Sequence, residues 1–597
     1  MRVLGISAYY HDSAAALVED GVVRAAAQLE RFTRHKHDSA FPSEAIRYCL
    51  EEAGVGLEDV DYVGFYDKPL LSFDRLLETF VGFAPRGFPS FAASMPLWVK
   101  QKVFQKQAIL RELSALGLGA ASPDRLLFGF HHHSHAASAF YPSPFEEAAI
   151  LVMDGVGEWA TTTVGVGRGN EIELLREIRF PHSLGLLYSA FTYYLGFKVN
   201  DGEYKLMGLA PYGEPRFVDL IHEHLISLLE DGSFRMDMRY FNYCTGLTMT
   251  NRRFDALFGG PPRRAGDPIE QRHMDLAASV QSVTADAVMR ICNGLRRETG
   301  MENLCMAGGV ALNCVVNGEL LREGPFDGLW IQPAAGDAGA SIGIAQTLSY
   351  TVGGVGRCIP DDGRDGMAGA YLGPAFSDDD IGGMLEAAGA RYRRLDDALL
   401  FPEVAEALDA EKVVGWFQGR MEFGPRALGN RSILADPRSP RMQRLLNLKI
   451  KYRESFRPFA PAVLTEDVSK HFALERESPY MLLVTPVHGE SGVGEGDDHA
   501  QKGLAKLHAV RGDLPAITHV DGSARVQTVS AEKNPRFHRL LQAFKARTGI
   551  GVLVNTSFNV ADEPIVCSPV DAYHCFLGTE MDVLVLGNHV VLKEEQP

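Results

Sequence analysis

The sequence lacks the segments that direct a chain into or across a membrane. No basic stretch followed by an apolar stretch opens it, and none of its apolar runs is long enough to span a bilayer. Secreted and membrane-spanning proteins carry such segments. We therefore expect a cytoplasmic protein with no membrane partner.

Paired cysteines are also missing. The sequence has no Cys-x-x-Cys, and its 8 cysteines are scattered: Cys49, Cys244, Cys292, Cys305, Cys314, Cys358, Cys567 and Cys575. Thiolate zinc sites need closely spaced pairs, and disulfide frameworks belong to oxidising compartments. The pattern excludes a thiolate zinc framework and fits a reducing compartment.

An excess of positive charge is absent as well. The net charge of -17 argues against a broad surface for nucleic acid, and it leaves room for a local basic pocket. The length of 597 residues predicts more than one domain. Residues 351–366, rich in Gly, Arg and Asp, have the composition of a linker.

A cluster of histidines is the most distinctive feature that the sequence does have. Residues 131–135 hold four histidines in five positions, after an apolar strand-like run and before a helix-compatible stretch of small residues. On a helix, His131 and His135 share a face, so their imidazoles would point at one place. Such a pair suits Fe, Zn, Ni or Mn. A polar helix start with solvated histidines is the alternative.

Two aspartates could complete a metal site. Asp154 ends a buried strand, and Asp337 begins a small-residue helix after another strand. Asp337 could also be only a helix cap. With His131 and His135, the two aspartates would supply two nitrogens and two carboxylates.

The first 30 residues predict a three-stranded antiparallel meander with a polar first bend that contains His11 and Asp12. Such a hairpin begins each half of the actin-like ATPase fold, where its tip touches phosphate. Paired glycines, Gly308 and Gly309, lie between a later strand and helix, where a nucleotide can approach bare backbone.

Residues 69–117 are aromatic and helical in pattern, which is typical of helical core, an acceptor wall or a dimer surface. Residues 233–266 are irregular.

The second half of the chain contains a local basic pattern. Residues 419–432 and 449–461 together hold seven basic residues, with Gly, Pro and aromatics between them, in an acidic chain. Arginine forks match phosphates bidentately, so the pattern favours a phosphate pocket over a solvated loop. Residues 488–499, rich in Gly, Glu and Asp, are predicted to form a mobile loop.

Seven motifs together resemble the carbamoyltransferase family of tobramycin, cephalosporin and nodulation-factor carbamoyltransferases. They are His-Asp-Ser-Ala-Ala at 11–15, His-His-His-Ser-His-Ala at 131–136, Met-Asp-Gly at 153–155, Lys-Leu-Met-Gly-Leu-Ala at 205–210, Gly-Gly-Val-Ala-Leu-Asn at 308–313, Gly-Pro-Arg-Ala-Leu-Gly at 424–429 and Asn-Thr-Ser-Phe-Asn at 555–559. The resemblance covers nearly the whole chain.

The resemblance implies an α/β protein with two domains. Residues 1–357 would form an actin-like (ASKHA, duplicated RNase H-like) domain, and residues 358–597 a YrdC-like α/β domain. The second would make carbamoyl-adenylate from carbamoyl phosphate and ATP, with Mg. The first would hold Fe(II) or a similar divalent metal and pass the carbamoyl group to a hydroxyl of a small-molecule acceptor. A homodimer is also suggested by the resemblance.

The resemblance also assigns site residues by motif. The metal ligands would be His131, His135, Asp154 and Asp337. His11 and Asp12 would be catalytic, and either could be the general base. Glu203, Lys205, Gly308, Gly309 and Asn313 would bind the nucleotide. Arg426, Lys451, Arg457, Arg525, Asn555, Ser557 and Asn559 would bind carbamoyl phosphate and the ATP phosphates.

Two other functions are alternatives to natural-product or sugar O-carbamoylation. One is tRNA threonylcarbamoylation by a fused chain, which the acidic balance disfavours. The other is an actin-like, nucleotide-switched binding protein without chemistry, which the arginine-rich second half disfavours. The acceptor and the identity of the metal are not encoded in any motif.

Overall fold

The computed structural model describes the chain except for residues 120, 361–362, 490–502, 510 and 597. Most of the stretch predicted as a mobile loop, 488–499, lies outside the described residues. The chain divides into two compact units. The first comprises Met1–Leu29 and Ser39–Gly366, and the second comprises Glu30–Asp38 and Met367–Pro597. No described helix is both long enough and apolar enough to cross a membrane.

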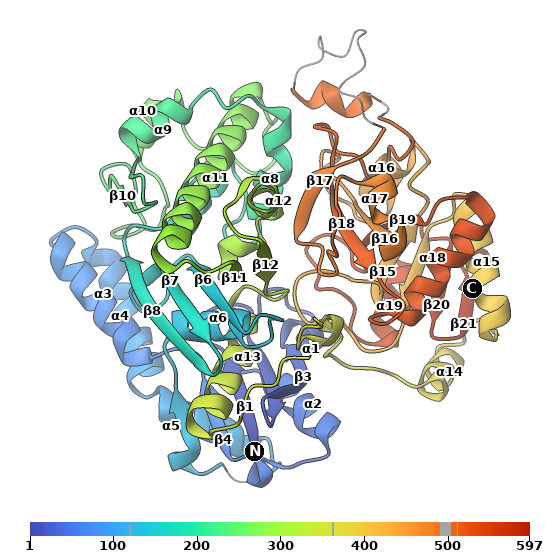
Figure 1. The fold of residues 1–597 in the computed structure, drawn as a ribbon, viewed down its shortest axis with the longest axis horizontal. Coiled ribbons are helices and arrows are strands. Elements are labelled where there is room, and N and C mark those ends of the chain that lie inside the picture. Colours follow the sequence, from blue (N-terminus) through green and yellow to red (C-terminus); the bar gives the residue numbers. More distant parts are fainter. Residues whose placement is uncertain (120, 361–362, 490–502, 510, 597) are drawn as a thin grey trace. The chain divides into compact units, whose positions relative to one another are not determined.

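The first unit contains two five-stranded sheets that share one topology (Figure 1). The order β3-β2-β1-β4-β5 comprises Arg2–Ser7 (β1), Ala14–Glu19 (β2), Val22–Gln28 (β3), Tyr62–Phe65 (β4) and Leu126–Phe128 (β5). The order β8-β7-β6-β11-β12 comprises Glu147–Met153 (β6), Ala160–Arg168 (β7), Glu171–Arg179 (β8), Asn303–Ala307 (β11) and Gly328–Ile331 (β12). In each, three antiparallel strands are followed by two parallel strands. This duplication confirms the predicted actin-like class.

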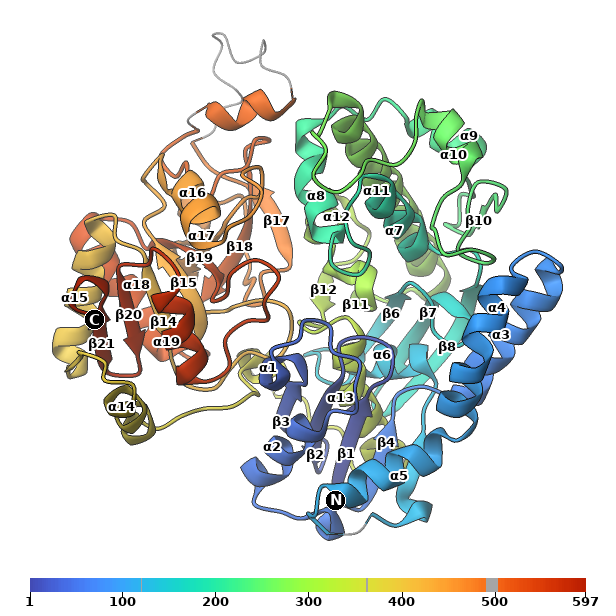
Figure 2. The same cartoon turned by 180° about the vertical axis from the view of Figure 1, so that it is seen from behind.

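Helices and one small hairpin surround these sheets. They are α2 (Ser43–Ala53), α3 (Pro69–Phe83), α4 (Phe88–Trp98), α5 (Gln105–Ala115), α6 (His131–Phe140), α7 (Leu184–Tyr194), α8 (Glu203–Leu209), α9 (Val218–His224), β9 (Ile226–Leu228), β10 (Phe234–Met236), α10 (Arg252–Phe258), α11 (Gln271–Thr299), α12 (Cys314–Glu323) and α13 (Asp337–Thr347). Figure 2 shows α3, α4 and α5 in blue, as it does α2. Residues 233–266, predicted as irregular, therefore contain β10 and α10.

The close approach of α6 and α13 is the contact that matters most for the site. Each helix follows the fifth strand of its sheet. A Cβ on Gly343 of α13 would overlap the carbonyl oxygen of Ser134 and would lie 2.7 Å from the nitrogen of Ser138, both on α6. Only a bare backbone fits there. The small residues of α13 thus allow the two helices to pack backbone to backbone.

The second unit is built on a nine-stranded mixed sheet. In spatial order its strands are β13 (Arg393–Arg394), β21 (His589–Leu592), β20 (Val583–Leu586), β14 (Val414–Phe417), β15 (Arg431–Ala435), β19 (Val552–Ser557), β16 (Ala460–Leu464), β18 (Ser523–Val529) and β17 (Leu483–Pro486). Its helices include α14 (Asp378–Ala387), α15 (Asp397–Asp409), α16 (Met442–Leu445), α17 (Val468–His471), α18 (Pro535–Thr548) and α19 (Pro569–Leu577). Trp416 lies in a core formed with α15 and α18. The predicted α/β class is confirmed.

A short segment from the start of the chain, Glu30–Asp38, packs with the second unit and includes α1 (Glu30–Thr33). Phe32 packs against a cluster formed by Met421, Ala427, Ile565 and Cys567. Arg31 donates to the carbonyl of Gly424 at 2.8 Å, and Arg34 donates to the carbonyls of Ile565 at 2.6 Å and Pro564 at 2.7 Å. Both arginines therefore join this segment to the second unit through hydrogen bonds to backbone carbonyls.

We expect Gly343→Ala to destabilise the first unit by about 1–3 kcal/mol, because the added methyl group overpacks the contact between α6 and α13. Faster amide hydrogen exchange of peptides from these two helices would show it. Gly383→Ala in α14 is the matched control, since a Cβ there meets no atom within 4 Å. That change should be neutral or stabilising by roughly 0.5–1 kcal/mol. Unchanged exchange in Gly343→Ala would contradict the packing argument.

Candidate functional site

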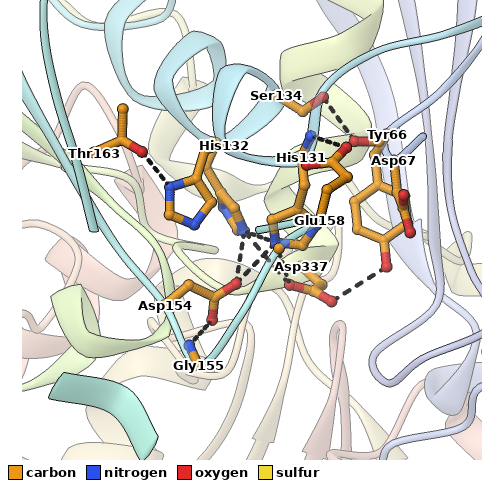
Figure 3. Close-up of polar contacts among 12 residues, drawn as sticks. Tyr66, Asp67, His131, His132, Ser134, Asp154, Gly155, Glu158, Thr163 and Asp337 are labelled. Carbon is orange, nitrogen blue, oxygen red and sulfur yellow. Dashed lines mark hydrogen bonds and ion pairs between the residues drawn. The ribbon is translucent and has the colours of Figure 1, made fainter. Parts of the chain in front are cut away.

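Four side chains converge in the first unit, from three separate parts of the fold (Figure 3). His131 and His135 lie one turn apart on α6, Asp154 follows β6, and Asp337 is the first residue of α13. One ligand atom from each lies within 4.8 Å of the others. Gly336 is the N-cap of α13, so the alternative of Asp337 as only a cap is wrong.

The spacing of these atoms suits a divalent cation. His131 Nε2 lies 2.8 Å from Asp154 Oδ2 and 3.1 Å from His135 Nε2. His135 Nε2 lies 3.4 Å from Asp337 Oδ1 and 3.6 Å from Asp154 Oδ2. Ligand atoms bound at about 2.1 Å to one ion are roughly 3.0–3.4 Å apart. Two imidazole nitrogens facing each other between two carboxylates are therefore a donor set that fits such an ion.

Charge interactions shift the pKa values of all four groups. Burial by itself lowers the pKa of His131, but the carboxylates of Asp337 and Asp154 outweigh it and raise that pKa to about 9. The pKa of His135 is raised in the same way. Burial would raise the pKa of Asp154, yet its hydrogen bonds to the two histidines hold it well below the ordinary value. The carboxylates are thus ionised and available as ligands at neutral pH.

Neighbouring groups hold these side chains in place. The Tyr66 hydroxyl donates to Asp337 Oδ2 at 3.3 Å. Glu158 accepts from the backbone N–H of His131 at 2.9 Å and from that of Lys68 at 3.0 Å, and so ties α6 to the start of α3. His132 Nδ1 lies 2.6 Å from the Thr163 hydroxyl, so its ring binds β7 (Figure 3). Partners of this kind orient metal-binding side chains.

His11 and Asp12 lie at the tip of the β1–β2 hairpin, beside the four-residue cluster. His11 Nδ1 is 3.0 Å from Asp12 Oδ2, and His11 Nε2 is 3.9 Å from Asp337 Oδ2. Burial lowers the pKa of His11, but Asp337, Asp12 and Asp154 together raise it to about 10. The two ring nitrogens of His11 therefore each face a carboxylate, one of Asp12 and one of Asp337.

The predicted nucleotide-binding residues lie on two elements of the same unit. A Cβ on Gly308 would overlap the carbonyl oxygen of Met153, so this glycine lets the loop after β11 pass close to Asp154. A Cβ on Gly309 would lie 3.7 Å from Asp154 Oδ1. Asn313 caps α12 through Val316 and exchanges amide hydrogen bonds of 3.1 Å with Gln281. Glu203 and Lys205 lie in the first turn of α8.

The second unit gathers several cations in the segment before β16. Burial lowers the pKa of Arg453, and the nearby guanidinium groups of Arg457 and Arg525 lower it further. Burial also lowers the pKa of Lys451, with Arg453 as the next cause. Cations that depress one another's pKa values lie close together. Arg453 was not among the predicted residues, although it lies within the basic stretch 449–461.

Lys451 binds a turn rather than standing open to solvent. The residue is 3% exposed. Its ammonium group lies 2.7 Å from the carbonyl oxygen of Ser557 and 2.8 Å from that of Asn559. It is also 2.6 Å from Asn559 Oδ1 and 3.2 Å from Ser557 Oγ. The three predicted residues Lys451, Ser557 and Asn559 are thus brought together in one network.

Arg426 lies on a loop beside the end of β19. Asn555 Nδ2 donates to the carbonyl of Ala427 at 3.2 Å and to Gln527 Oε1 at 2.6 Å. This contact places the loop of Arg426 next to the strand that ends at Ser557. The residues predicted for phosphate binding therefore lie on neighbouring elements of one unit.

The sequence of the chain is similar to known families and proteins. Residues 2–346 match a family model described as the carbamoyltransferase N-terminus, and residues 405–593 match one described as the carbamoyltransferase C-terminus. An uncharacterised protein of Synechocystis sp. is 59% identical, with 100% of this chain and 97% of that protein covered. Nodulation protein NolNO of Sinorhizobium fredii is 39% identical, with 98% and 79% covered. The 3'-hydroxymethylcephem-O-carbamoyltransferase of Streptomyces clavuligerus is 36% identical, with 48% of each chain covered.

We expect His135→Ala and Asp337→Asn each to lower the amount of divalent metal that the purified protein retains, because each removes one of four converging donors. Elemental analysis after dialysis measures this directly. His133→Ala is the matched control: it lies on the same helix, and it is not one of the four converging residues. Metal retention equal to the unaltered protein in both site variants would remove the cluster as a metal centre.

Proposed function

The chain belongs to the carbamoyltransferase family, and from that premise we propose that it is an ATP-dependent O-carbamoyltransferase. It would make carbamoyl-adenylate from carbamoyl phosphate and ATP in the second unit. The first unit would pass the carbamoyl group to a hydroxyl of a small natural product or a sugar. The observation that supports this best is the presence of two different clusters of charged side chains in one chain. A cation-rich segment stands in one unit, and a carboxylate–imidazole cluster stands in the other.

The first half-reaction brings together two polyanions. Water would release phosphate from carbamoyl phosphate, and an oxygen of the resulting carbamate would attack the α-phosphorus of ATP, so that pyrophosphate leaves. Fixed cations must offset the repulsion before this attack can occur. Arg426, Arg457 and Arg525 are our candidates for that role. We add Arg453, because Arg457 and Arg525 lower its pKa and so lie near it. Lys451 donates hydrogen bonds to Ser557 and Asn559 and so holds the turn that carries them.

The second half-reaction needs a polarised carbonyl and a proton acceptor. His131, His135, Asp154 and Asp337 would hold Fe(II) or a similar divalent ion, which when bound supplies Lewis acidity and orients phosphate oxygens. His11 and Asp12 would handle the proton of the acceptor hydroxyl as this oxygen attacks the carbamoyl carbon and AMP leaves. The glycine loop at Gly308 would hold the adenosine.

The names of two relatives support the proposed class of acceptor. One relative is named as an O-carbamoyltransferase of a hydroxymethyl group on a cephem, and another as a nodulation protein. A hydroxyl acceptor that is a small molecule fits the first name. The net charge of -17 gives no support to a tRNA acceptor.

The test supplies carbamoyl phosphate and ATP without an acceptor and measures the release of phosphate and pyrophosphate. We expect both, and we expect Arg426→Ala to release pyrophosphate at least about 100-fold more slowly, because it removes a cation that stabilises the transition state. The absence of pyrophosphate from the unaltered protein, with and without hydroxyl acceptors, would instead favour a nucleotide-switched binding protein.

A second prediction separates the two half-reactions. His11→Ala should release pyrophosphate at nearly the normal rate and should fail to carbamoylate the acceptor, since His11 lies in the first unit beside the carboxylate cluster. Product formation is followed by mass spectrometry. Equal loss of both half-reactions in His11→Ala would overturn this assignment. A pH profile of Asp12→Asn then identifies which of the two residues accepts the proton.

A further inference from the structure

The loop that carries Arg426 is folded around a buried carboxylate. Glu422 is 3% exposed, and its Oε1 accepts three backbone hydrogen bonds. The donors are the N–H groups of Leu428 at 2.7 Å, Asn430 at 2.8 Å and Arg431 at 3.1 Å. Glu422 precedes Arg426 in the sequence, and the three amides that it binds follow Arg426. These hydrogen bonds therefore close the loop that carries Arg426.

The carbonyls of the same loop are bound by side chains from other parts of the unit. The carbonyl of Leu428 accepts from the Tyr371 hydroxyl and from Gln527 Nε2, each at 2.8 Å. The carbonyl of Ala427 accepts from Asn555 Nδ2 at 3.2 Å. Both the amide and the carbonyl groups of the residues that follow Arg426 are therefore held by hydrogen bonds, which restrains the backbone of its loop.

A carboxylate in this place is unfavourable for binding an anion nearby. By charge alone, neutralising Glu422 would make the surroundings of Arg426 more positive and would tighten the binding of phosphate. A carboxylate bonded to three amides does something else: it determines the backbone shape, because charge-assisted hydrogen bonds are stronger than neutral ones. If the charge of Glu422 matters most, neutralising it should tighten phosphate binding. If its hydrogen bonds matter most, the same change should weaken phosphate binding.

We propose that Glu422 is a positioning residue for anion binding, which acts by folding residues 424–430 so that the guanidinium group of Arg426 faces the phosphate group. The inference rests on the proposed function, because it takes Arg426 to bind carbamoyl phosphate or ATP. It adds a residue whose own charge repels the ligand and whose hydrogen bonds nevertheless improve binding.

The test uses Glu422→Gln in the full-length protein, with inorganic pyrophosphate as the probe for binding and carbamoyl phosphate as the varied substrate. We expect the Kd for pyrophosphate and the KM for carbamoyl phosphate each to rise at least 10-fold, with a smaller change in kcat. Binding as tight as in the unaltered protein, or tighter, would overturn the inference.

Two further variants control for a general loss of stability. Asp467→Asn removes a buried carboxylate of the same unit that is 1% exposed and pairs with Lys470 and Lys545. It should lower the melting temperature and leave both constants unchanged. Tyr371→Phe removes one bond from the other side of the loop, and should raise both constants by a smaller factor than Glu422→Gln. It also keeps the inference testable if Glu422→Gln does not fold.

Arg426→Ala separates a failure of this inference from a failure of the proposed function. If Arg426→Ala leaves pyrophosphate binding unchanged, the assignment of Arg426 as an anion-binding residue fails, and the inference fails with it. If Arg426→Ala weakens binding, the double variant decides the point. Glu422→Gln should then have no further effect in the Arg426→Ala background, because it acts through Arg426. Additive effects would show that Glu422 acts independently.

Discussion

Two carboxylates that must be neutralised, one buried and one partly buried, impose the main constraint on the first unit. Asp337 is 1% exposed, the side chain of Asp154 is 13% exposed, and their oxygens converge on the same two imidazoles. Uncompensated buried charge is costly, so a stable arrangement needs protons on the histidines or a cation among the donors. The carboxylates raise the pKa values of His131 and His11, which favours the first arrangement. The donor geometry suits the second.

The duplicated topology explains how these donors meet. His131 is the first residue of the helix that follows the fifth strand of one sheet, and Asp337 is the first residue of the equivalent helix in the other. His11 and Asp154 occupy the equivalent hairpins, between the first two strands of each sheet. Helix N-termini stabilise negative charge, which eases the burial of Asp337. The cluster is thus assembled from matching positions of the two repeats.

Local patterns made part of this predictable from the sequence. The spacing of His131 and His135 predicted a shared helix face, and the strand ends before Asp154 and Asp337 predicted their neighbourhood. The repeat itself was invisible as sequence similarity, because strand order and helix packing tolerate different side chains. The packing of Glu30–Asp38 with the second unit was also hidden, since the contact of Phe32 with Met421 joins residues far apart in the chain. No local pattern records such a contact.

Local sequence was also an incomplete guide to the cationic residues. The composition indicated a basic cluster, but it did not indicate what each side chain binds. Lys451 donates to oxygens of Ser557 and Asn559. Glu422 binds backbone amides of the Arg426 loop, and the sequence shows it only as one acidic residue among arginines. In the proposed reaction, ATP and carbamoyl phosphate are polyanions, whereas carbamoyl-adenylate would keep only one ionised phosphate oxygen. Cations arranged for the two reactants would therefore bind the adenylate more weakly, because Coulomb attraction scales with ligand charge. Formation of the proposed intermediate would thus weaken its binding to these cations and favour its transfer.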